Sequence, residues 1–114
     1  VSVDGGMGDN IRPVLYEARY EAVLANRADE AAAEMVTVAG RFCESGDVLV
    51  RDVMLPRAQV GDIVAIPVSG AYAPAMASNY NAVPRPAIVM VNDGEARLIR
   101  RRETYEDLMS RDNV

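Results

Sequence analysis

Residues 87–101 read Ala-Ile-Val-Met-Val-Asn-Asp-Gly-Glu-Ala-Arg-Leu-Ile-Arg-Arg. Two β-prone runs, 87–91 and 96–101, flank the tetrapeptide Asn92–Glu95. An Asp-Gly pair at the centre of such a loop favours the tight turn whose twist matches that of two antiparallel strands. The stretch therefore predicts a β-hairpin, and it is the strongest local indication of structure in the chain.

Short strands and turns continue toward the N-terminus. We expect further strands at 1–3, 20–24, 34–39, 47–55 and 63–68, separated by turns that contain Gly, Pro, Asn or Asp. About six or seven short strands at this spacing predict a mainly β fold, a Greek-key-like barrel or sandwich with a few short helices. Alternating strands and helices around a parallel sheet are not indicated.

Three short helices and one further turn complete the predicted elements. Pro13 fits the first turn of a helix over 14–17, and residues 71–81 contain no β-branched residue. Thr104 precedes a short helix in capping-box style, although Asp107 replaces the preferred Glu or Gln. The segment 4–6, Asp-Gly-Gly, predicts a tight turn of residues that tolerate a positive φ.

The composition excludes several classes of site. A chain of 114 residues is long enough for one domain with its own core, and we expect a single domain over 1–114. All twelve basic residues are Arg, so the chain alone cannot provide a lysine Schiff base, a His general base or a His metal site, and we predict no metal. The net charge of −5 argues against nucleic acid or an anionic membrane as a partner.

The single Cys excludes an intrachain disulfide and fits a reducing compartment, so we expect a cytoplasmic protein. No apolar run approaches the roughly 20 residues of a membrane helix, and the first residues do not resemble a signal peptide. Because the chain opens with Val1-Ser2-Val3 in a strand-like pattern, we interpret it as a piece of a longer protein.

Three places carry candidate chemistry. Cys43 and Glu44 are adjacent in a predicted loop, where they suit either acid chemistry and ammonium binding or a packed Cys beside a solvated Glu. Arg12 and Tyr16 are four residues apart on one helical face, as in a carboxylate clamp or a simple surface stack. Tyr72 follows a turn, where it either contacts a phosphate or substrate or covers the edge of the core.

A series of motifs links these places. In chain order they are Asp4-Gly5-Gly6-Met7, then Asp9-Asn10-Ile11-Arg12-Pro13-Val14-Leu15-Tyr16, Cys43-Glu44-Ser45-Gly46-Asp47, Gly70-Ala71-Tyr72 with Ser78-Asn79-Tyr80-Asn81, Arg85-Pro86-Ala87, and residues 93–108. Together they resemble the C-terminal β-barrel domain of the diaminopimelate decarboxylase family, whose fold is that of alanine racemase/ornithine decarboxylase-like enzymes. The Cys-Glu-Ser-Gly-Asp block is the most discriminating of them.

The resemblance implies a fold, a cofactor and an assembly. An N-terminal (β/α)8 barrel, absent from this chain, would carry pyridoxal 5'-phosphate on a Lys, and the enzyme would be a homodimer with active sites at the subunit interface. Its reaction would be decarboxylation of meso-2,6-diaminopimelate to L-lysine, the last step of lysine biosynthesis. The isolated chain is predicted to be inactive.

The resemblance also implies a role for each candidate residue. Arg12 would bind the distal carboxylate of the substrate, and Tyr16 would contact the substrate. Cys43 would be the catalytic proton donor and Glu44 would hold the distal amino end, both reaching into the partner subunit's site. Tyr72 would lie near both cofactor and substrate.

Two alternatives stay open on the sequence. One is a sister pyridoxal-phosphate decarboxylase of basic amino acids or polyamine precursors, of the ornithine or carboxynorspermidine type. Glu44 directly after Cys43, together with Arg12, favours diaminopimelate instead. The other alternative is a non-catalytic β module used for dimerisation, which would explain the absence of Lys and His equally well.

Overall fold

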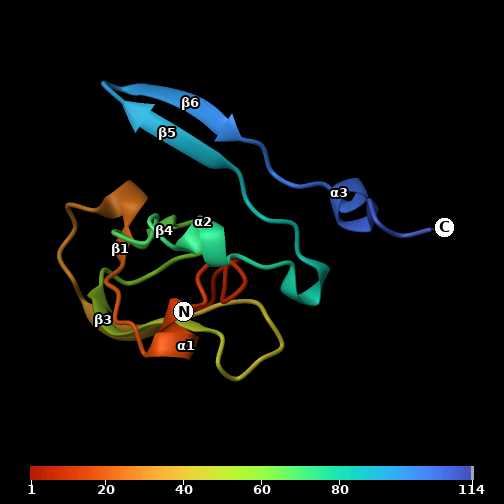
Figure 1. Ribbon diagram of the computed structural model, residues 1–114. Helices are drawn as coiled ribbons and strands as arrows, with labels where there is room; N and C mark the ends of the chain where they lie inside the picture. The colour runs from red at the N-terminus through yellow and green to blue at the C-terminus, as the bar shows by residue number, and fades with distance from the viewer. Residues whose placement is uncertain (114) are drawn as a thin grey trace. The chain divides into compact units, whose positions relative to one another are not determined.

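A computed structural model describes residues 1–113 of the chain. By its internal contacts the chain divides into two compact units, residues 1–77 and a second unit that begins at Ser78. The N-terminal unit contains, in order, α1 (Arg12–Tyr16), β1 (Val23–Leu24), the 3₁₀ helix η1 (Ala25–Arg27), β2 (Glu34–Ala39), β3 (Val48–Leu55), β4 (Val64–Ala65) and α2 (Ala73–Met76). The second unit contains the 3₁₀ helix η2 (Tyr80–Ala82), β5 (Ile88–Asn92), β6 (Glu95–Arg100) and α3 (Tyr105–Met109) (Figure 1).

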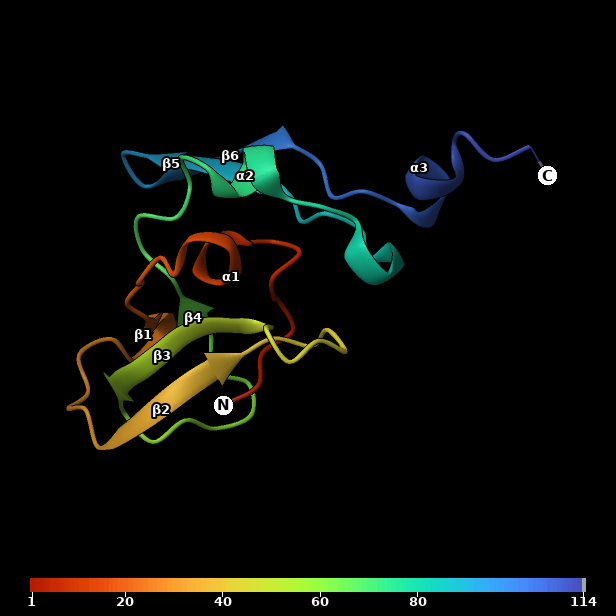
Figure 2. The same ribbon diagram turned by 60° about the horizontal axis from the view of Figure 1, so that its bottom comes forward.

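The N-terminal unit is built on two antiparallel strand pairs. β2 pairs with β3 over their full length, from Glu34 opposite Leu55 to Ala39 opposite Val48, with register shifts near Val38 (Figure 2). The predicted strand 34–39 is confirmed with the same bounds, and the predicted strand 47–55 begins one residue later. β1 pairs with β4.

The core of this unit joins residues from both strand pairs. Six buried side chains form it: Ala22, Leu24, Val38, Leu49, Val50 and Leu55. All six are aliphatic, in keeping with the Ala- and Val-rich composition. Burial of each Leu or Val side chain contributes about 1.5–3 kcal/mol to the stability of the fold, relative to leaving the side chain exposed. The core therefore holds β2 and β3 against β1 and gives the loops around them a fixed base.

The β1–β4 pair is much shorter than the strands predicted for this part of the chain. Only Val23–Leu24 pairs with Val64–Ala65. Pro67 has no N–H to donate, so the ladder ends before it. On the other side of the pair the Asn26 side chain replaces a ladder bond, because its Oδ1 accepts the Ile63 N–H (2.9 Å). The two segments consequently separate next to Pro67.

The N-terminal residues extend the β2 edge. The Val3 N–H donates to the Ala39 carbonyl (2.9 Å), and the Ala39 N–H donates to the Val1 carbonyl (2.8 Å). Ser2 thereby forms a parallel bridge with Ala39, which agrees with the predicted strand end.

The prediction of a tight turn at residues 4–6, built on glycines with positive φ, is wrong. Among the described residues the glycines with positive φ are Gly61 and Gly94, not those of this segment. Gly6 instead allows a close approach, because a Cβ there would lie 2.5 Å from Phe42 Cδ2. The hydrogen-bonded turn comes slightly later, where the Asp9 N–H donates to the Gly6 carbonyl (2.9 Å).

The hairpin of the second unit confirms the prediction from the Asp-Gly pair. β5 and β6 are antiparallel, with Asn92 opposite Glu95 across a two-residue turn. Asp93 (φ 49°) and Gly94 (φ 79°) both adopt left-handed conformations, as a type I′ turn requires.

The predicted capping box is also confirmed. The Asp107 N–H donates to Thr104 Oγ1 (3.3 Å), and the Thr104 N–H donates back to Asp107 Oδ2 (2.8 Å). The helical turns predicted within 71–81 appear as α2 and η2.

The mainly β class with few short helices is therefore confirmed. The strand pairings among residues 1–113 form three two-stranded ladders, and the Greek-key barrel or sandwich stays a prediction. No helix in the described part of the chain has both the length and the apolar character needed to cross a membrane.

Candidate functional site

Arg12 is the centre of a cluster of side chains in the N-terminal unit. Its guanidinium carbon lies 4.5 Å from the centroid of the Tyr72 ring and 5.5 Å from that of the Tyr16 ring. Tyr16 lies on α1, one helical turn after Arg12, whereas Tyr72 is the residue directly before α2. The structure thus brings together three of the four residues that the sequence proposed for substrate binding, whereas the fourth, Glu44, lies on another loop.

The conformation of α1 fixes where Arg12 points. Pro13 occupies its first turn, where a missing N–H costs no helical hydrogen bond, and Glu17 ends the helix in a left-handed conformation (φ 53°). Asn10 is buried just before the helix, and its Oδ1 accepts the Arg12 N–H (3.4 Å). A short helix with defined ends therefore presents a half-buried arginine.

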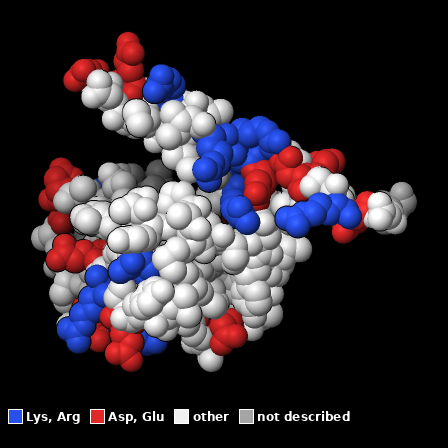
Figure 3. All heavy atoms as spheres, in the orientation of Figure 1, with Lys and Arg blue, Asp and Glu red and all other residues white. Residues whose placement is uncertain are grey.

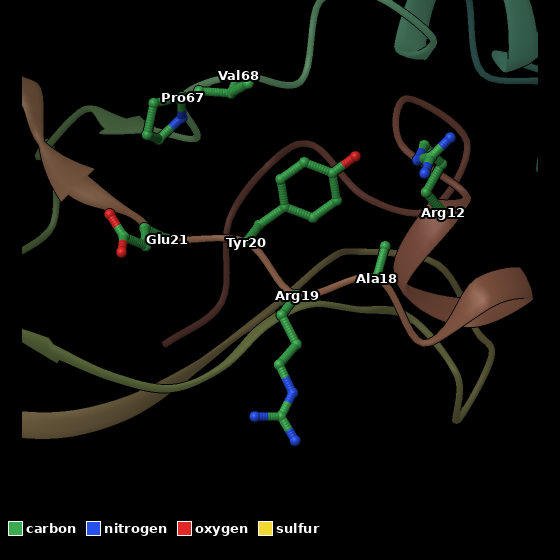
Figure 4. Close-up of a pocket in the computed structure, with 7 residues that line it drawn as sticks. All are labelled: Arg12, Ala18, Arg19, Tyr20, Glu21, Pro67 and Val68. Carbon is green, nitrogen blue, oxygen red and sulfur yellow. The ribbon is translucent and has the colours of Figure 1, made fainter.

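An open pocket lies beside Arg12. It has a volume of about 390 Å³ and is lined by Arg12, Ala18, Arg19, Tyr20, Glu21, Pro67 and Val68. Figure 4 shows the Tyr20 ring extending into the space between Arg12 and the Pro67–Val68 segment, while the Arg19 side chain extends to the other side of the backbone. The pocket forms where Pro67 ends the β1–β4 ladder, so the break in the strand pair creates the space.

Arg12 has no ion-pair partner among residues 1–113. Both of its contacts are with aromatic faces, which attract a cation without accepting its N–H groups in the guanidinium plane. Those donors remain available to an anion, and a planar fork of this kind suits a carboxylate.

The loop between β2 and β3 presents Cys43 and Glu44. Both side chains are exposed. The Glu44 carboxylate is oriented by its own loop, because Oε1 accepts the Gly46 N–H (3.3 Å) and the Ser45 hydroxyl (3.4 Å). The loop thus carries a thiol and a carboxylate outward from a fixed turn.

Asp47 ends this loop and is buried, with 4% of its surface exposed. Its Oδ1 accepts the Met7 N–H (2.6 Å), and its Oδ2 accepts the Phe42 N–H (2.7 Å). We refer to this pair of bonds as the Asp47 clamp. It joins the glycine-rich segment near the N-terminus to the residue directly before Cys43.

The two groups of candidate residues lie on adjoining segments. A Cβ on Gly46 would lie 3.5 Å from Val14 Cγ1, so the end of the Cys43–Glu44 loop packs beside α1.

The ion pairs of the described residues lie elsewhere and are structural. Arg27 pairs with Glu30 (2.6 Å) and Asp62 (2.9 Å). The pKa of Arg27 is raised, chiefly by its hydrogen bond with Glu30, and that of Asp62 is lowered, chiefly by the Gln59 N–H. These bonds tie η1 to the turn before β4.

One residue of the short arginine run 100–102 near the C-terminus, Arg101, is also paired. Arg101 donates to both carboxylate oxygens of Asp107, which lowers the pKa of Asp107 and raises that of Arg101. Figure 3 shows basic and acidic side chains side by side on the molecule, with large uncharged areas between them.

Sequence reasoning missed the part that Asp47 plays. The motif Cys-Glu-Ser-Gly-Asp drew attention to its first two residues, and its last residue proves to be the buried one. The group of glycines at 5, 6 and 8 suggested a turn, and the structure shows that Gly6 and Gly8 instead allow a close approach of Phe42 and, at Gly6, of Asp47.

Comparisons with known proteins show the family of the chain. Residues 1–70 match the family model described as pyridoxal-dependent decarboxylase, C-terminal sheet domain. The chain is 55% identical to the diaminopimelate decarboxylase of Bacillus subtilis, covering 98% of this chain and 26% of that protein. It is 56% identical to the diaminopimelate decarboxylase of Synechocystis, covering 98% of this chain and 24% of that protein.

A solved structure shows the same fold. The diaminopimelate decarboxylase of M. jannaschii in co-complex with L-lysine superposes with a TM-score of 0.89 at 43% identity, covering 100% of this chain and 26% of that one. The chain thus spans about a quarter of the length of the relatives it matches. These matches, together with the strand pairing, show that the chain belongs to the pyridoxal-dependent decarboxylase family and corresponds to the C-terminal sheet domain of such an enzyme.

Proposed function

We propose that this chain is the C-terminal domain, over residues 1–114, of a longer homodimeric enzyme that decarboxylates meso-2,6-diaminopimelate to L-lysine. The observation that carries the proposal is the Arg12 guanidinium, held over two phenol rings with no ion-pair partner among residues 1–113. The names of the relatives supply the substrate. Diaminopimelate has a second carboxylate that lysine and ornithine lack, and Arg12 is suited to bind it.

Arg12 binds that distal carboxylate through its in-plane N–H groups. The guanidinium carbon lies over both the Tyr72 ring and the Tyr16 ring, and these contacts favour one orientation of the fork before the substrate arrives. Because the side chain is already ordered in the folded protein, binding does not have to supply the entropy cost of ordering it. A substrate without the distal carboxylate would leave these donors facing water.

Glu44 holds the distal ammonium group. Its Oε1 is already engaged by the Gly46 N–H and the Ser45 hydroxyl, whereas Oε2 accepts no hydrogen bond from the described residues. A carboxylate fixed by one oxygen and open at the other is suited to an ammonium donor. Together with Arg12 it would recognise both charges of the distal amino-acid end.

Cys43 supplies the proton of the reaction. Loss of CO₂ leaves an electron pair on the carbon that carried the carboxylate, and the product requires a proton at that carbon. The Cys43 thiol donates it, and the resulting thiolate takes up a proton from water after the product has left. Maintaining the thiol requires a reducing compartment, so we place the enzyme in the cytoplasm.

Pyridoxal phosphate supplies the electron sink that makes loss of CO₂ possible. Since this chain has no Lys, it cannot hold that group covalently, and we assign the Lys and the phosphate site to an N-terminal (β/α)8 barrel. The residues present fit a lining role: Tyr72 is 57% exposed, and its ring is held in place by Arg12. The isolated chain should accordingly be inactive.

The exposed Cys43–Glu44 loop supports a shared active site. Both side chains extend from the domain, as residues that complete a partner subunit's site would. We therefore propose a homodimer in which this loop enters the site of the other subunit.

The test is turnover by the full-length protein that contains this chain. Purified enzyme loaded with pyridoxal phosphate is supplied separately with meso-diaminopimelate, lysine and ornithine, and the released CO₂ and amine products are measured. Preferential release of CO₂ from diaminopimelate, with lysine as the product, supports the proposal. Faster turnover of ornithine would favour a sister decarboxylase, and no turnover of any substrate would favour the dimerisation module.

A further inference from the structure

The Cys43–Glu44 loop has no regular secondary structure, yet its two candidate residues need fixed positions. The Glu44 N–H donates to the Phe42 carbonyl (2.8 Å), and the Asp47 N–H donates to the Glu44 carbonyl (3.0 Å). These are short-range bonds within the loop and do not attach it to the rest of the domain. Hydrogen bonds that do reach other segments are made by residues at its two ends.

The Asp47 clamp provides that attachment. Its two bonds, from the Phe42 N–H (2.7 Å) and the Met7 N–H (2.6 Å), reach across the loop and to a segment 40 residues away in the sequence. A third bond closes the loop, because the Gly40 N–H donates to the Asp47 carbonyl (2.9 Å). The carboxylate is therefore the link between the start of the loop, its end and the N-terminal segment.

Two glycines lie directly against the Asp47 carboxylate, where a larger residue would not fit. A Cβ on Gly40 would lie 2.2 Å from Asp47 Oδ2, and a Cβ on Gly6 would lie 2.7 Å from Asp47 Oδ1. The Phe42 ring is enclosed in the same way, since a Cβ on Gly8 would lie 2.6 Å from its Cζ. The residue directly before Cys43 is thereby fixed through both its backbone and its ring.

A buried carboxylate needs its hydrogen bonds, because removal of an acceptor leaves buried donors unsatisfied. No ion pair reaches Asp47 from the described residues. A core of apolar residues would hold two strands together at less cost. The use of a carboxylate at this point is explained if the loop has to be held in one conformation.

We propose that Asp47 is a positioning residue that sets Cys43 and Glu44 for the reaction. It touches neither substrate nor cofactor and acts through the loop that it closes. The inference rests on the proposed function, since it takes Cys43 as the proton donor. A displacement of about 1 Å at a reacting group can lower the rate by roughly 100-fold.

The experiment is a double-mutant cycle in the full-length holoenzyme with Asp47→Asn and Cys43→Ala. Asn keeps the size of the side chain but presents an NH₂ group to one of the two donors. We expect Asp47→Asn to lower kcat by about 10- to 100-fold in the Cys43 enzyme and by less than about threefold in the Cys43→Ala background. Asp29→Asn, the same change at an exposed turn residue, is the matched control and should leave kcat unchanged.

Amide hydrogen exchange gives a second readout that does not depend on activity. Exchange at the Met7 and Phe42 amides should be slow in the unsubstituted enzyme and should accelerate in Asp47→Asn, while amides of β2 and β3 keep their rates. Gly40→Ala, which adds one methyl group against the carboxylate, should have the same local effect without changing a charge.

The outcomes separate the two proposals. If Cys43→Ala alone leaves kcat unchanged, the assignment of the proton donor in the proposed function fails. If Cys43→Ala lowers kcat but Asp47→Asn costs equally in both backgrounds, Asp47 is merely structural and the positioning inference is overturned. Rapid exchange of both amides in the unsubstituted enzyme overturns it as well, even where neither variant folds.

Discussion

At the scale of single residues, Arg12 is held by flat faces rather than by acceptors. The guanidinium lies over Tyr72 and near Tyr16, and each such contact is worth about 0.5–1 kcal/mol at an exposed site. An acidic partner would hold the side chain more firmly but would occupy the donors. Aromatic support therefore combines a fixed orientation with an unoccupied hydrogen-bonding edge.

Replacement of Arg12 should affect recognition of the distal carboxylate. In the full-length enzyme we expect Arg12→Ala to reduce kcat/KM for diaminopimelate. The loss should correspond to an increase of roughly 2–5 kcal/mol in the activation free energy, the range for loss of one partner of a buried charged pair. Arg12→Lys should rescue poorly, because an ammonium group cannot form the two-pronged contact. The affinity for pyridoxal phosphate, measured by titration of its absorbance, should barely change.

The comparison substrate decides the cause of that loss. Any residual turnover of lysine or ornithine is measured in the same Arg12→Ala enzyme and in the unsubstituted enzyme. A loss confined to diaminopimelate supports the assigned contact. Equal losses on all substrates would show that Arg12 supports the structure instead.

The residues of the site differ in how visible they are in the sequence. Arg12 and Tyr16 could be paired from helical spacing, and Cys43 with Glu44 from adjacency. The contact between Arg12 and Tyr72 could not be predicted, because it joins segments 60 residues apart through tertiary packing. Asp47 was hidden for the same reason, since burial of a carboxylate depends on groups distant in the chain.

At the scale of elements, local chemistry decided which predictions succeeded. The Asp-Gly turn and the Thr104 cap are set by residues within a few positions of one another, and both occur where predicted. The strands expected at 20–24 and 63–68 proved short, because Pro67 and the Asn26 side chain interrupt their pairing. Which residues of a β-prone run actually pair depends on the partner strand, which the run itself does not specify.

The left-handed turn of the β5–β6 hairpin should be sensitive to a side chain at Gly94. With φ at 79°, Gly94→Ala places a Cβ in a conformation that costs roughly 1–2 kcal/mol. Amides of β5 and β6 should then exchange about 5–30-fold faster in the full-length protein. Gly70→Ala is the control, since its Cβ would meet no atom within 4 Å; equal effects of the two changes would contradict a strained turn.

Glu103 should make the stability of the second unit dependent on acid pH. The Arg85 N–H (2.9 Å) and the Asn79 side chain (2.6 Å) donate to its carboxylate and lower its pKa in the folded protein. A folded pKa below the unfolded one contributes stability that is fully present above the unfolded value of 4.5 and is lost as the pH falls through the folded value.

Thermal unfolding between pH 7 and pH 3 measures this contribution. We expect the unfolding temperature to decrease as the pH is lowered beyond about 4.5. The decrease should be smaller in Glu103→Gln, because the amide has no proton to take up. Glu95→Gln, at an exposed position of β6, should keep the full pH dependence. Identical curves for Glu103→Gln and the unsubstituted protein would argue against the stabilising role of these bonds.

At the scale of the whole molecule, the chain contains only part of what the proposed reaction needs. It spans about a quarter of the length of its relatives, and it has a candidate acid and a candidate carboxylate binder but no Lys. The proposed homodimer divides the work further, since Cys43 would serve the site of the other subunit. This division can be tested by mixing defective subunits.

We expect Cys43→Ala to lower kcat of the full-length enzyme by about 10²–10⁴-fold, the usual contribution of a positioned acid. Mixing this variant with one that lacks the cofactor Lys should restore activity, because one of the two sites in a mixed dimer then has both intact residues. Activity is followed as CO₂ release after mixing, with subunit exchange verified by mass. Exchange without any recovery would contradict a shared site.

The close packing of Gly6 and Gly40 around Asp47 also constrains how this domain can be recombined. In a chimera of two related enzymes, any crossover between residues 8 and 40 takes one side of the Asp47 clamp from each parent. The hybrid can close only if the first parent contributes a glycine at 6 and the second contributes both the glycine at 40 and the aspartate at 47. Although distant in sequence, positions 6, 40 and 47 have to be compatible with one another. In a library of such hybrids, the active members should therefore retain Gly6, Gly40 and Asp47 together.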